Sequence, residues 1–511
     1  MAPGASLEAL SFDLGASASL LVPAEATSQE FSDAAVWDLI AAGDARAVHH
    51  IESPAMTSLC RMCDVRDIDT LVAIVSVIRP GAANEDKKRE FTRRYQGLRP
   101  VEYAHPSLEP VLRSTFGLVV YEEHILQICE VFAGLPGGRA DVLRRALVKE
   151  QWPVVAEIRK AFFACAAQRG RNEAETERVW EVVTGFHGYA FCKAHSAAYG
   201  VEAYQAAWLK RNHPAEFMAG VLTHGKGFYR PLVYVLECWR LGIPLMPPWV
   251  NEPGPGFRVT RDPLRGVPAI RVPVAYVAGL TEGLKERIKR ERDRGEFASL
   301  ADFYVRVQPG AEEIEALSRA GALDGFGSSR CEQFWEIQAL KARWAGAATV
   351  GQGWLMAPGS GGPGRLPRVL EEPSRLQCLQ WETELLGFPA SGHPLELHPE
   401  VAWETYCPVE RLGEFAGQEV TLCGLVIEDR LHHQAGGEPM KFLTLCDWTG
   451  MVETELFART YRSYGRATVR YPVLEVTGRV EPFENGRGQT LRVLRAGKPW
   501  SRPGAGVKAR S

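Results

Sequence analysis

The sequence lacks any apolar run of about 18 residues, the shortest length that usually spans a membrane as a helix. Its first 30 residues contain no Lys or Arg, so the basic segment that opens a secretory signal is missing. It also lacks an excess of positive charge, because its formal net charge is −3. We therefore expect a cytoplasmic protein without membrane contact, in which any nucleic-acid binding depends on local basic patches.

The cysteine pattern of a disulfide scaffold or a structural zinc site is also absent. Eleven cysteines are scattered along the 511-residue chain, as is typical of reduced cytoplasmic proteins. One Cys-x-x-Cys pair occurs, Cys60 and Cys63, with His49 and His50 nearby, but no second pair follows at zinc-finger spacing. We expect two packed thiols here and no metal ligands elsewhere.

Helical patterning is present over most of the chain and gives way to strands near its end. Residues 33–225 are predicted to be mostly helical, and residues 244–273, rich in Pro and Gly, to form a short β or loop insert. The Gly/Pro/Ala-rich residues 342–373 predict a flexible linker. After residue 414, five short alternating segments indicate a small barrel, with the OB-fold as the leading candidate.

Several sequence blocks carry the strongest functional signal, the longest being residues 188–199 (GYAFCKAHSAAY). The others include residues 51–53 (IES), 78–81 (IRPG), 100–106 (PVEYAHP), 120–127 (VYEEHILQ), 143–149 (LRRALVK), 213–218 (HPAEFM) and 391–395 (SGHPL). In this order, over about residues 33–495, they resemble the bacterial DNA polymerase III alpha subunit from its fingers to its OB-fold. Residues 227–229 (GFY) are closer to the error-prone relative than to the main replicase.

The resemblance implies a multidomain α+β chain, with mostly helical fingers and a helix-hairpin-helix region followed by a small all-β OB-fold barrel. The predicted boundaries are 1–32 for a weakly ordered palm edge, 33–225 for the fingers, 226–330 for the helix-hairpin-helix region, 331–400 for the linker, 401–500 for the OB-fold and 501–511 for a disordered tail.

In such a polymerase the fingers meet the triphosphate of the incoming nucleotide with Lys and Arg side chains. Arg144, Arg145 and Lys149 lie within about a turn and a half of one predicted helix. Lys193 and His195 directly precede the next long helix. We predict that these five residues bind nucleotide phosphates. The alternative is a solvated basic helix face.

Two further regions are predicted to contact the DNA backbone. The first contains Arg79, Lys87 and Lys88, for which a charged surface loop is the alternative. The second resembles a helix-hairpin-helix turn, in which backbone N–H groups hold a phosphate. Its candidate residues are Gly279, Thr281, Gly283 and Lys285. Thr281 replaces a family Gly, so its Cβ is expected to hinder the tight turn.

The linker holds a sequence that resembles the family's sliding-clamp motif, in which a Gln precedes an apolar pair. Here the residues are Gln352, Leu355 and Met356, with Met356 in place of the usual Phe. An extended segment of this kind docks in a pocket of its partner. The alternative is an unremarkable stretch of linker.

The barrel is predicted to bind single-stranded DNA, because OB-folds stack bases on aromatic side chains in a basic groove. The candidate aromatic residues are Phe442, Trp448 and Phe457. Some aromatic residues of a small barrel must instead fill its interior.

Polymerisation also needs Mg²⁺ held by paired carboxylates, which the complete polymerase is expected to bind. The one Asp-x-Asp sequence, Asp67-Ile68-Asp69, falls at a predicted helix start, where we expect a cap, with Asp69 the capping residue, and no metal site. Asp13 weakly resembles a third family carboxylate, with an exposed N-terminal Asp as the alternative. No metal is therefore expected to bind this chain alone.

Three hypotheses follow. In the first, the chain belongs to a polymerase for DNA replication or damage-tolerant repair synthesis, inactive without a palm from another chain. In the second, it is a non-catalytic module that binds DNA and the sliding clamp. In the third, it is a degenerate remnant of a polymerase gene.

Overall fold

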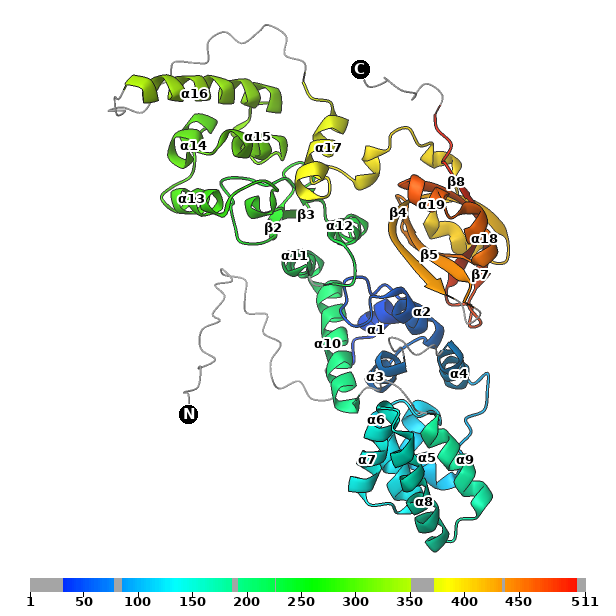
Figure 1. Ribbon diagram of the computed structural model, residues 1–511. Helices are drawn as coiled ribbons and strands as arrows, with labels where there is room; N and C mark the ends of the chain where they lie inside the picture. Colours follow the sequence, from blue (N-terminus) through cyan, green and yellow to red (C-terminus); the bar gives the residue numbers. More distant parts are fainter. Residues whose placement is uncertain are drawn as a thin grey trace, which may run out of the picture.

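The computed structural model describes residues 31–77, 85–185, 192–225, 227–350, 372–433 and 437–502, although side chains 85–87 and 343–350 are not described. Its helices are followed by a closed barrel, which lies beside α2 and α4 in Figure 1. The predicted α+β class, helical first and β last, is confirmed. Within the described residues, no helix is both long and apolar enough to cross a membrane.

The first part of the chain is helical, as predicted. Its helices are α1 (Ala34–Ala41), α2 (Pro54–Cys63), α3 (Ile68–Val77), α4 (Glu85–Tyr95), α5 (Glu109–Leu112), α6 (Glu122–Ile128), α7 (Gly137–Val148), α8 (Trp152–Gln168), α9 (Glu173–Thr184), α10 (Lys193–Asn212), α11 (Pro214–His224) and α12 (Pro231–Arg240). Helices α6–α9 enclose one apolar core around Phe132, Leu143 and Phe162. A second core joins α1–α4 to α10 through residues such as Ile40 and Leu59.

Helix α10 packs unusually closely on α3. A Cβ at Gly200 would lie 2.7 Å from Cγ2 of Val72, so only glycine fits at this position without a shift. The hydroxyls of Ser76 and Ser196 lie 2.6 Å apart and add a buried hydrogen bond between the same helices. These contacts fix the N-terminal half of α10, which carries residues 193–199 of the longest sequence block.

The start of α3 corrects one prediction. The Asp67 carboxylate, and not that of Asp69, accepts the capping hydrogen bonds, from the Thr70 backbone N–H at 2.8 Å and the Thr70 hydroxyl at 2.7 Å. The helix begins at Ile68, so Asp67 stands directly before it, where a side-chain oxygen reaches the free N–H groups. A cap therefore accounts for the Asp-x-Asp sequence.

The middle of the chain forms a small sheet followed by helices. Its elements are β1 (Leu245–Met246), β2 (Arg258–Arg261), β3 (Pro268–Arg271), α13 (Glu282–Asp293), α14 (Leu300–Val307), α15 (Ala311–Arg319), α16 (Arg330–Val350) and α17 (Arg375–Leu386). Helices α16 and α17 both fall within residues 331–400, which were predicted to be linker, and α16 continues past residue 342, where the Gly/Pro/Ala-rich stretch begins. The Ala-rich composition of this stretch explains the difference, because Ala is the strongest helix former.

The barrel has the strand connectivity of an OB-fold. Its elements are β4 (Glu419–His433), β5 (Pro439–Cys446), β6 (Met451–Leu456), α18 (Ala458–Tyr464), α19 (Ala467–Arg470), β7 (Val473–Pro482) and β8 (Gln489–Gly497). The closed order is β4-β5-β6-β8-β7, with β6 and β8 parallel and the helices between the third and fourth strands. All five strands expected from alternation are present.

The turn between β7 and β8 attaches the barrel to the first helices. Glu484 accepts hydrogen bonds from the Arg93 guanidinium on α4 at 2.7 and 3.1 Å. The Asn485 amide donates to the carbonyls of Arg61 and Met62 on α2, both at 2.9 Å. One side of the barrel therefore lies against α2 and α4.

Candidate functional site

Arg144 lies at a corner between α6 and α7 and is held by two carboxylates. Its Nη1 donates to Glu122 at 2.6 Å, and its Nη2 donates to Asp141 at 2.8 Å. The Arg144 side chain is 22% exposed, so the fork is partly desolvated but open to solvent on one side. Arg145, on the next position of the helix, pairs only with Asp141 and is 65% exposed.

Glu123, the residue after Glu122, forms a hydrogen bond with the N-terminus of α10. Both of its carboxylate oxygens accept from the Lys193 backbone N–H at 2.9 Å. A helix N-terminus carries free N–H groups and partial positive charge, which favour an anion. The Lys193 ammonium lies 5.6 Å from the ring centre of Tyr121, the residue that directly precedes Glu122 and Glu123 in the sequence.

The structure thus brings Arg144 and the start of α10 to the same place, the first turn of α6. We call this place the phosphate corner, defined by Glu122, Glu123, Arg144 and Lys193. Lys149, at the end of α7, and His195, in the first turn of α10, are exposed, and no contact joins them to the corner among the described interactions. Carboxylates occupy the donors of the phosphate corner that a phosphate would use.

The electrostatics of the corner favour ionised acids and neutral histidine. Burial opposes ionisation of Glu123, but hydrogen bonds from the Cys192 thiol and the Lys193 backbone outweigh it and lower its pKa. Hydrogen bonds from Arg144 lower the pKa of Asp141. Burial, with repulsion from Lys193, lowers the pKa of His124 to about 4, so its ring is neutral at pH 7.

The helix-hairpin-helix turn is built without the strain expected from Thr281. Gly279 has φ +84°, which suits glycine, whereas Thr281 has φ −73° and ψ 150° and caps α13 through a hydrogen bond from the Leu284 N–H. The Cβ of Thr281 therefore does not hinder the turn, and that expectation is wrong. The Glu313 carboxylate accepts from the Thr281 hydroxyl at 2.6 Å and from its N–H at 3.1 Å.

The other turn residues lie on α13 itself. Gly283 is in the first turn of the helix, and the Lys285 ammonium pairs with Glu282 at 2.7 Å. At this second helix N-terminus, as at α10, a carboxylate from another element accepts one backbone N–H.

Several predicted site residues cannot be placed. Asp13, Arg79, Gln352, Leu355 and Met356 lie outside the described residues. Lys87 falls within α4, although its side chain is not described. Lys88 is partly buried on the same helix, so this basic segment is helical and not a loop.

Two of the three predicted barrel aromatics, Phe442 on β5 and Phe457 directly after β6, lie on one outer face of the barrel. Phe442 pairs across the strands with Glu455, and Phe457 follows Glu455 by two residues, so their side chains share a face. The Arg492 guanidinium lies 4.8 Å from the ring centre of Phe457. Burial and repulsion from Glu481 raise the pKa of Glu455, an effect that the nearby Lys88 opposes.

Trp448 does not share this face. It lies in the turn between β5 and β6, where its ring stacks on His393 with centroids 4.6 Å apart. It also meets Trp403 edge-on at 6.4 Å. Although 47% exposed, Trp448 is already part of the packing between the barrel and the segment that precedes it.

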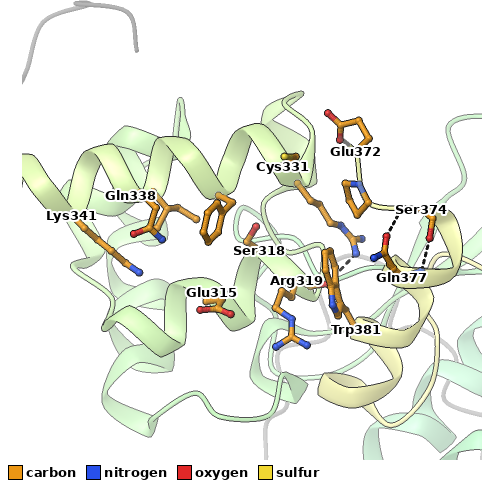
Figure 2. Close-up of a pocket in the computed structure, with 14 residues that line it drawn as sticks. Glu315, Ser318, Arg319, Cys331, Gln338, Lys341, Glu372, Ser374, Gln377 and Trp381 are labelled. Atoms are coloured by element: carbon orange, nitrogen blue, oxygen red, sulfur yellow. Dashed lines mark hydrogen bonds between the residues drawn. The ribbon is translucent and has the colours of Figure 1, made fainter. Parts of the chain in front are cut away.

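A groove of about 630 Å³ lies between α15, α16 and α17 (Figure 2). Arg319 and Trp381 form part of its wall, with the guanidinium carbon 5.6 Å from the ring centre. Arg330 is fixed by Asp324 and Glu382 at 2.9 and 2.8 Å. None of the residues that line this groove was predicted as a site residue, and none belongs to the phosphate corner.

The described residues do not provide the oxygen-rich ligand set that Mg²⁺ prefers. In this part of the chain, the three-residue cluster suited to a metal is His49, His50 and Glu202, with two nitrogen ligands. Cys60 and Cys63 are both buried, and burial raises the pKa of each thiol to about 12.

Sequence reasoning missed the acidic partners of the site, namely Glu122, Glu123 and Glu313. The first two lie inside the block at residues 120–127, so their position in a block was a usable signal. No sequence signal links Glu313 to Thr281, because the two are distant in the chain and meet only through the packing of α13 on its neighbours.

Comparisons with known proteins agree with this architecture. Residues 22–170 match the bacterial DNA polymerase III alpha subunit finger domain, and residues 242–333 match the helix-hairpin-helix motif. The chain is thus similar to the bacterial DNA polymerase III alpha subunit over a finger domain and a helix-hairpin-helix region, which an OB-type barrel follows.

Its relatives include the DNA polymerase III subunit alpha of Thermus aquaticus, 33% identical over 484 residues that cover 90% of this chain and 38% of the relative. The protein of the same name from Aquifex aeolicus is 31% identical over 84% of this chain and 36% of its own length. The Escherichia coli protein is 30% identical over 92% of this chain and 42% of its own length. The chain thus spans less than half the length of these relatives.

Proposed function

We propose that this chain forms the fingers, DNA-binding hairpin and OB-fold part of a DNA polymerase III alpha-type DNA polymerase, and that its phosphate corner binds the triphosphate of the incoming nucleotide. The observation that carries the proposal is the pair of consecutive glutamates, which hold Arg144 and the Lys193 N–H. Carboxylate and phosphate oxygens accept from the same donors, so a triphosphate is the natural competitor for both.

The corner can bind and orient phosphate but does not itself supply the reaction. Arg144 offers a planar fork, and the start of α10 offers backbone N–H groups together with the Lys193 ammonium. When a triphosphate displaces Glu122 and Glu123, their charge moves away and the anion gains these donors. Mg²⁺, held by palm carboxylates, would activate the primer hydroxyl and neutralise the leaving phosphates.

In this proposal the palm carboxylates come from polypeptide other than these 511 residues, either a separate chain or further sequence of the same protein. The test is primer extension with Mg²⁺ by this chain mixed with a palm-containing polypeptide encoded beside it. We expect extension by the mixture and none by either part alone. A well-folded mixture that binds primed DNA but adds no nucleotide counts against the proposal.

The DNA path belongs to the same proposal. The face with Phe442 and Phe457 lies on the second and third strands of the barrel, which OB-folds use for single strands. Lys88 and Arg492 add positive charge beside it. We propose that template single strand passes between α4 and the barrel, and that the α13 turn binds duplex backbone.

The same barrel face favours a second candidate, a DNA-binding module without catalysis. Salt-dependent binding of single-stranded DNA by this chain alone is expected for both candidates. Extension by the reconstituted mixture separates them. A clamp contact through Gln352, Leu355 and Met356, a role in error-prone synthesis and a cytoplasmic location remain parts of the proposal that rest on the sequence.

A further inference from the structure

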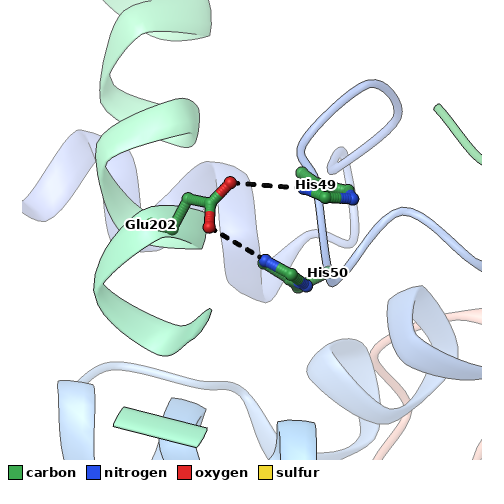
Figure 3. Close-up of side chains that lie close together, drawn as sticks. All are labelled: His49, His50 and Glu202. Atoms are coloured by element: carbon green, nitrogen blue, oxygen red, sulfur yellow. Dashed lines mark hydrogen bonds and ion pairs between the residues drawn. The ribbon is translucent and has the colours of Figure 1, made fainter. Parts of the chain in front are cut away.

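Two histidines and a glutamate meet where the loop between α1 and α2 touches α10 (Figure 3). His49 Nδ1 lies 3.2 Å from Glu202 Oε1, and His50 Nε2 lies 3.0 Å from Glu202 Oε2. The three candidate ligand atoms all lie within 4.8 Å of one another. The cluster was not expected from the sequence, because Glu202 lies far from the histidines along the chain.

We propose that His49, His50 and Glu202 form a site for a divalent transition-metal ion, with Zn²⁺ the best match, and that the ion keeps an open coordination position. Two imidazoles with one carboxylate are a ligand set found in open zinc sites. Tetrahedral Zn²⁺ with bonds of about 2.0–2.2 Å separates its ligand atoms by about 3.3 Å, close to both imidazole–carboxylate distances. Mg²⁺ and Ca²⁺ fit poorly, because they prefer oxygen ligands.

The two rings are arranged for ion binding more than for double protonation. They stack with centroids 4.1 Å apart and an interplanar angle of 27°. Two imidazolium rings at that distance repel each other, whereas two neutral rings can each turn a lone pair toward one ion.

The surroundings hold one ligand firmly and leave the others accessible. Tyr199, one turn before Glu202 on α10, stacks on His50 with centroids 4.1 Å apart. His50 also has φ +66°, an uncommon backbone conformation for a residue other than glycine. The side chains of His49 and Glu202 are 57% and 55% exposed, so an ion can enter from solvent and retain a water ligand.

A bound ion would fix the loop that carries Glu52. The buried Glu52 carboxylate, two residues after His50, accepts from the Phe228 N–H at 2.6 Å and the Tyr234 hydroxyl at 3.0 Å. Through these bonds the loop connects α10 to α12. We therefore expect metal binding to raise the thermal stability of the chain.

The test uses the full chain without a polyhistidine tag, treated with chelator and then titrated with Zn²⁺ alone or Co²⁺ alone. We expect one equivalent to bind, a higher melting temperature, and affinity lowered at least about tenfold by His49→Ala with His50→Ala and by Glu202→Gln. The control His433→Ala removes an exposed histidine on β4 and should bind like the unchanged chain.

Co²⁺ identifies the ligands, because a cysteine ligand adds a thiolate charge-transfer band that His and Glu do not. Binding without that band, abolished by the double histidine variant, supports the site. The proposal is overturned if no ion binds, if the histidine variants bind as tightly as the unchanged chain, or if a thiolate band accompanies all binding.

Discussion

The Glu123 carboxylate occupies the N-terminus of α10, with both of its oxygens 2.9 Å from the Lys193 backbone nitrogen. If this carboxylate stands where a nucleotide phosphate binds, then weakening its hydrogen bond to the Lys193 N–H should favour binding of the phosphate. Glu123→Gln removes the charge and keeps an acceptor. We expect it to tighten triphosphate binding about two- to fivefold, the effect of one charge at a helix N-terminus.

Fluorescent nucleotide titration at low salt measures this change. Glu130→Gln is the matched control, because Glu130 is an exposed glutamate just after α6, away from the corner. Equal affinities for the two variants would show that Glu123 does not compete with phosphate.

Arg144 and Arg145 are neighbours with different expected roles. Arg144→Ala leaves Glu122 and Asp141 without their shared partner, so we expect a loss of about 1–3 kcal/mol in the free energy of unfolding. Arg145→Ala breaks an exposed pair and should cost about 0–1 kcal/mol. Urea denaturation measures both, and equal losses would contradict the assignment of Arg144 as the fixed residue.

A buried ion pair between α10 and α12 should control acid stability. Lys210 and Glu237 have fully buried side chains 2.7 Å apart. Burial alone would raise the pKa of Glu237, but Lys210 and Arg240 lower it to about 2. Because the unfolded value is about 4.3, the stabilisation is complete above that pH and is lost as the pH falls toward 2.

Lys210→Met should therefore cost about 1–3 kcal/mol of unfolding free energy at pH 7, since the buried Glu237 carboxylate loses one of its two cationic partners and keeps only Arg240. Lys285→Met breaks a pair with an exposed glutamate and serves as the control, with about 0–1 kcal/mol expected. Similar losses in the two variants, or a stability independent of pH between 5 and 2, would refute this account.

A cooperative thermal transition of the unchanged chain would also argue against the degenerate-remnant hypothesis.

The hairpin turn gives a test of Thr281. Thr281→Ala removes the cap of α13 and should cost about 1 kcal/mol in stability, whereas Thr281→Gly should cost a few tenths. Since the turn is unstrained, Thr281→Gly should bind duplex DNA no more tightly than the unchanged chain. Glu313→Gln should bind it more tightly, because a negative charge leaves the helix N-terminus. Gel-shift titrations measure the affinity of each variant for duplex DNA. Tighter binding by Thr281→Gly but not by Glu313→Gln would show that the Thr281 Cβ does hinder the turn.

On the barrel, Phe442→Ala and Phe457→Ala should each weaken single-strand binding by about 1–3 kcal/mol. Trp448→Ala is the comparison, because its ring is already stacked on His393 and should contribute less. Anisotropy titrations with labelled oligonucleotides measure all three. A larger loss for Trp448→Ala than for the two phenylalanine variants would move the binding face to the turn.

Local patterns predicted much of the fold. Alternation identified all five barrel strands, and the apolar period predicted that residues 33–225 are mostly helical, because these segments carry their own signal. Helix α16 was missed, because the Gly- and Pro-rich residues downstream of it led to a predicted linker from residue 331. The capping residue of α3 was predicted two residues too late, at Asp69 in place of Asp67, because the sequence offers two aspartates for the role.

The site was only half predictable. Basic residues were found because phosphate chemistry requires them, but their acidic partners became visible only when α6 was placed against α7 and α10. The sequence does not distinguish Trp448 from Phe457 as candidates for stacking on bases. Only the structure shows that the Trp448 ring already stacks on His393. Likewise, His49 and His50 gain a ligand from Glu202 solely because α10 crosses their loop.

The most direct test of the phosphate corner is equilibrium binding of a deoxynucleoside triphosphate to the chain at low salt. The account predicts saturable binding that Arg144→Ala combined with Lys193→Ala weakens at least about tenfold, the equivalent of about 1.4 kcal/mol. Arg159→Ala, a change in an exposed arginine of α8, should leave it unaltered. Unchanged affinity in the double variant, or no saturable binding by the unchanged chain, would contradict it.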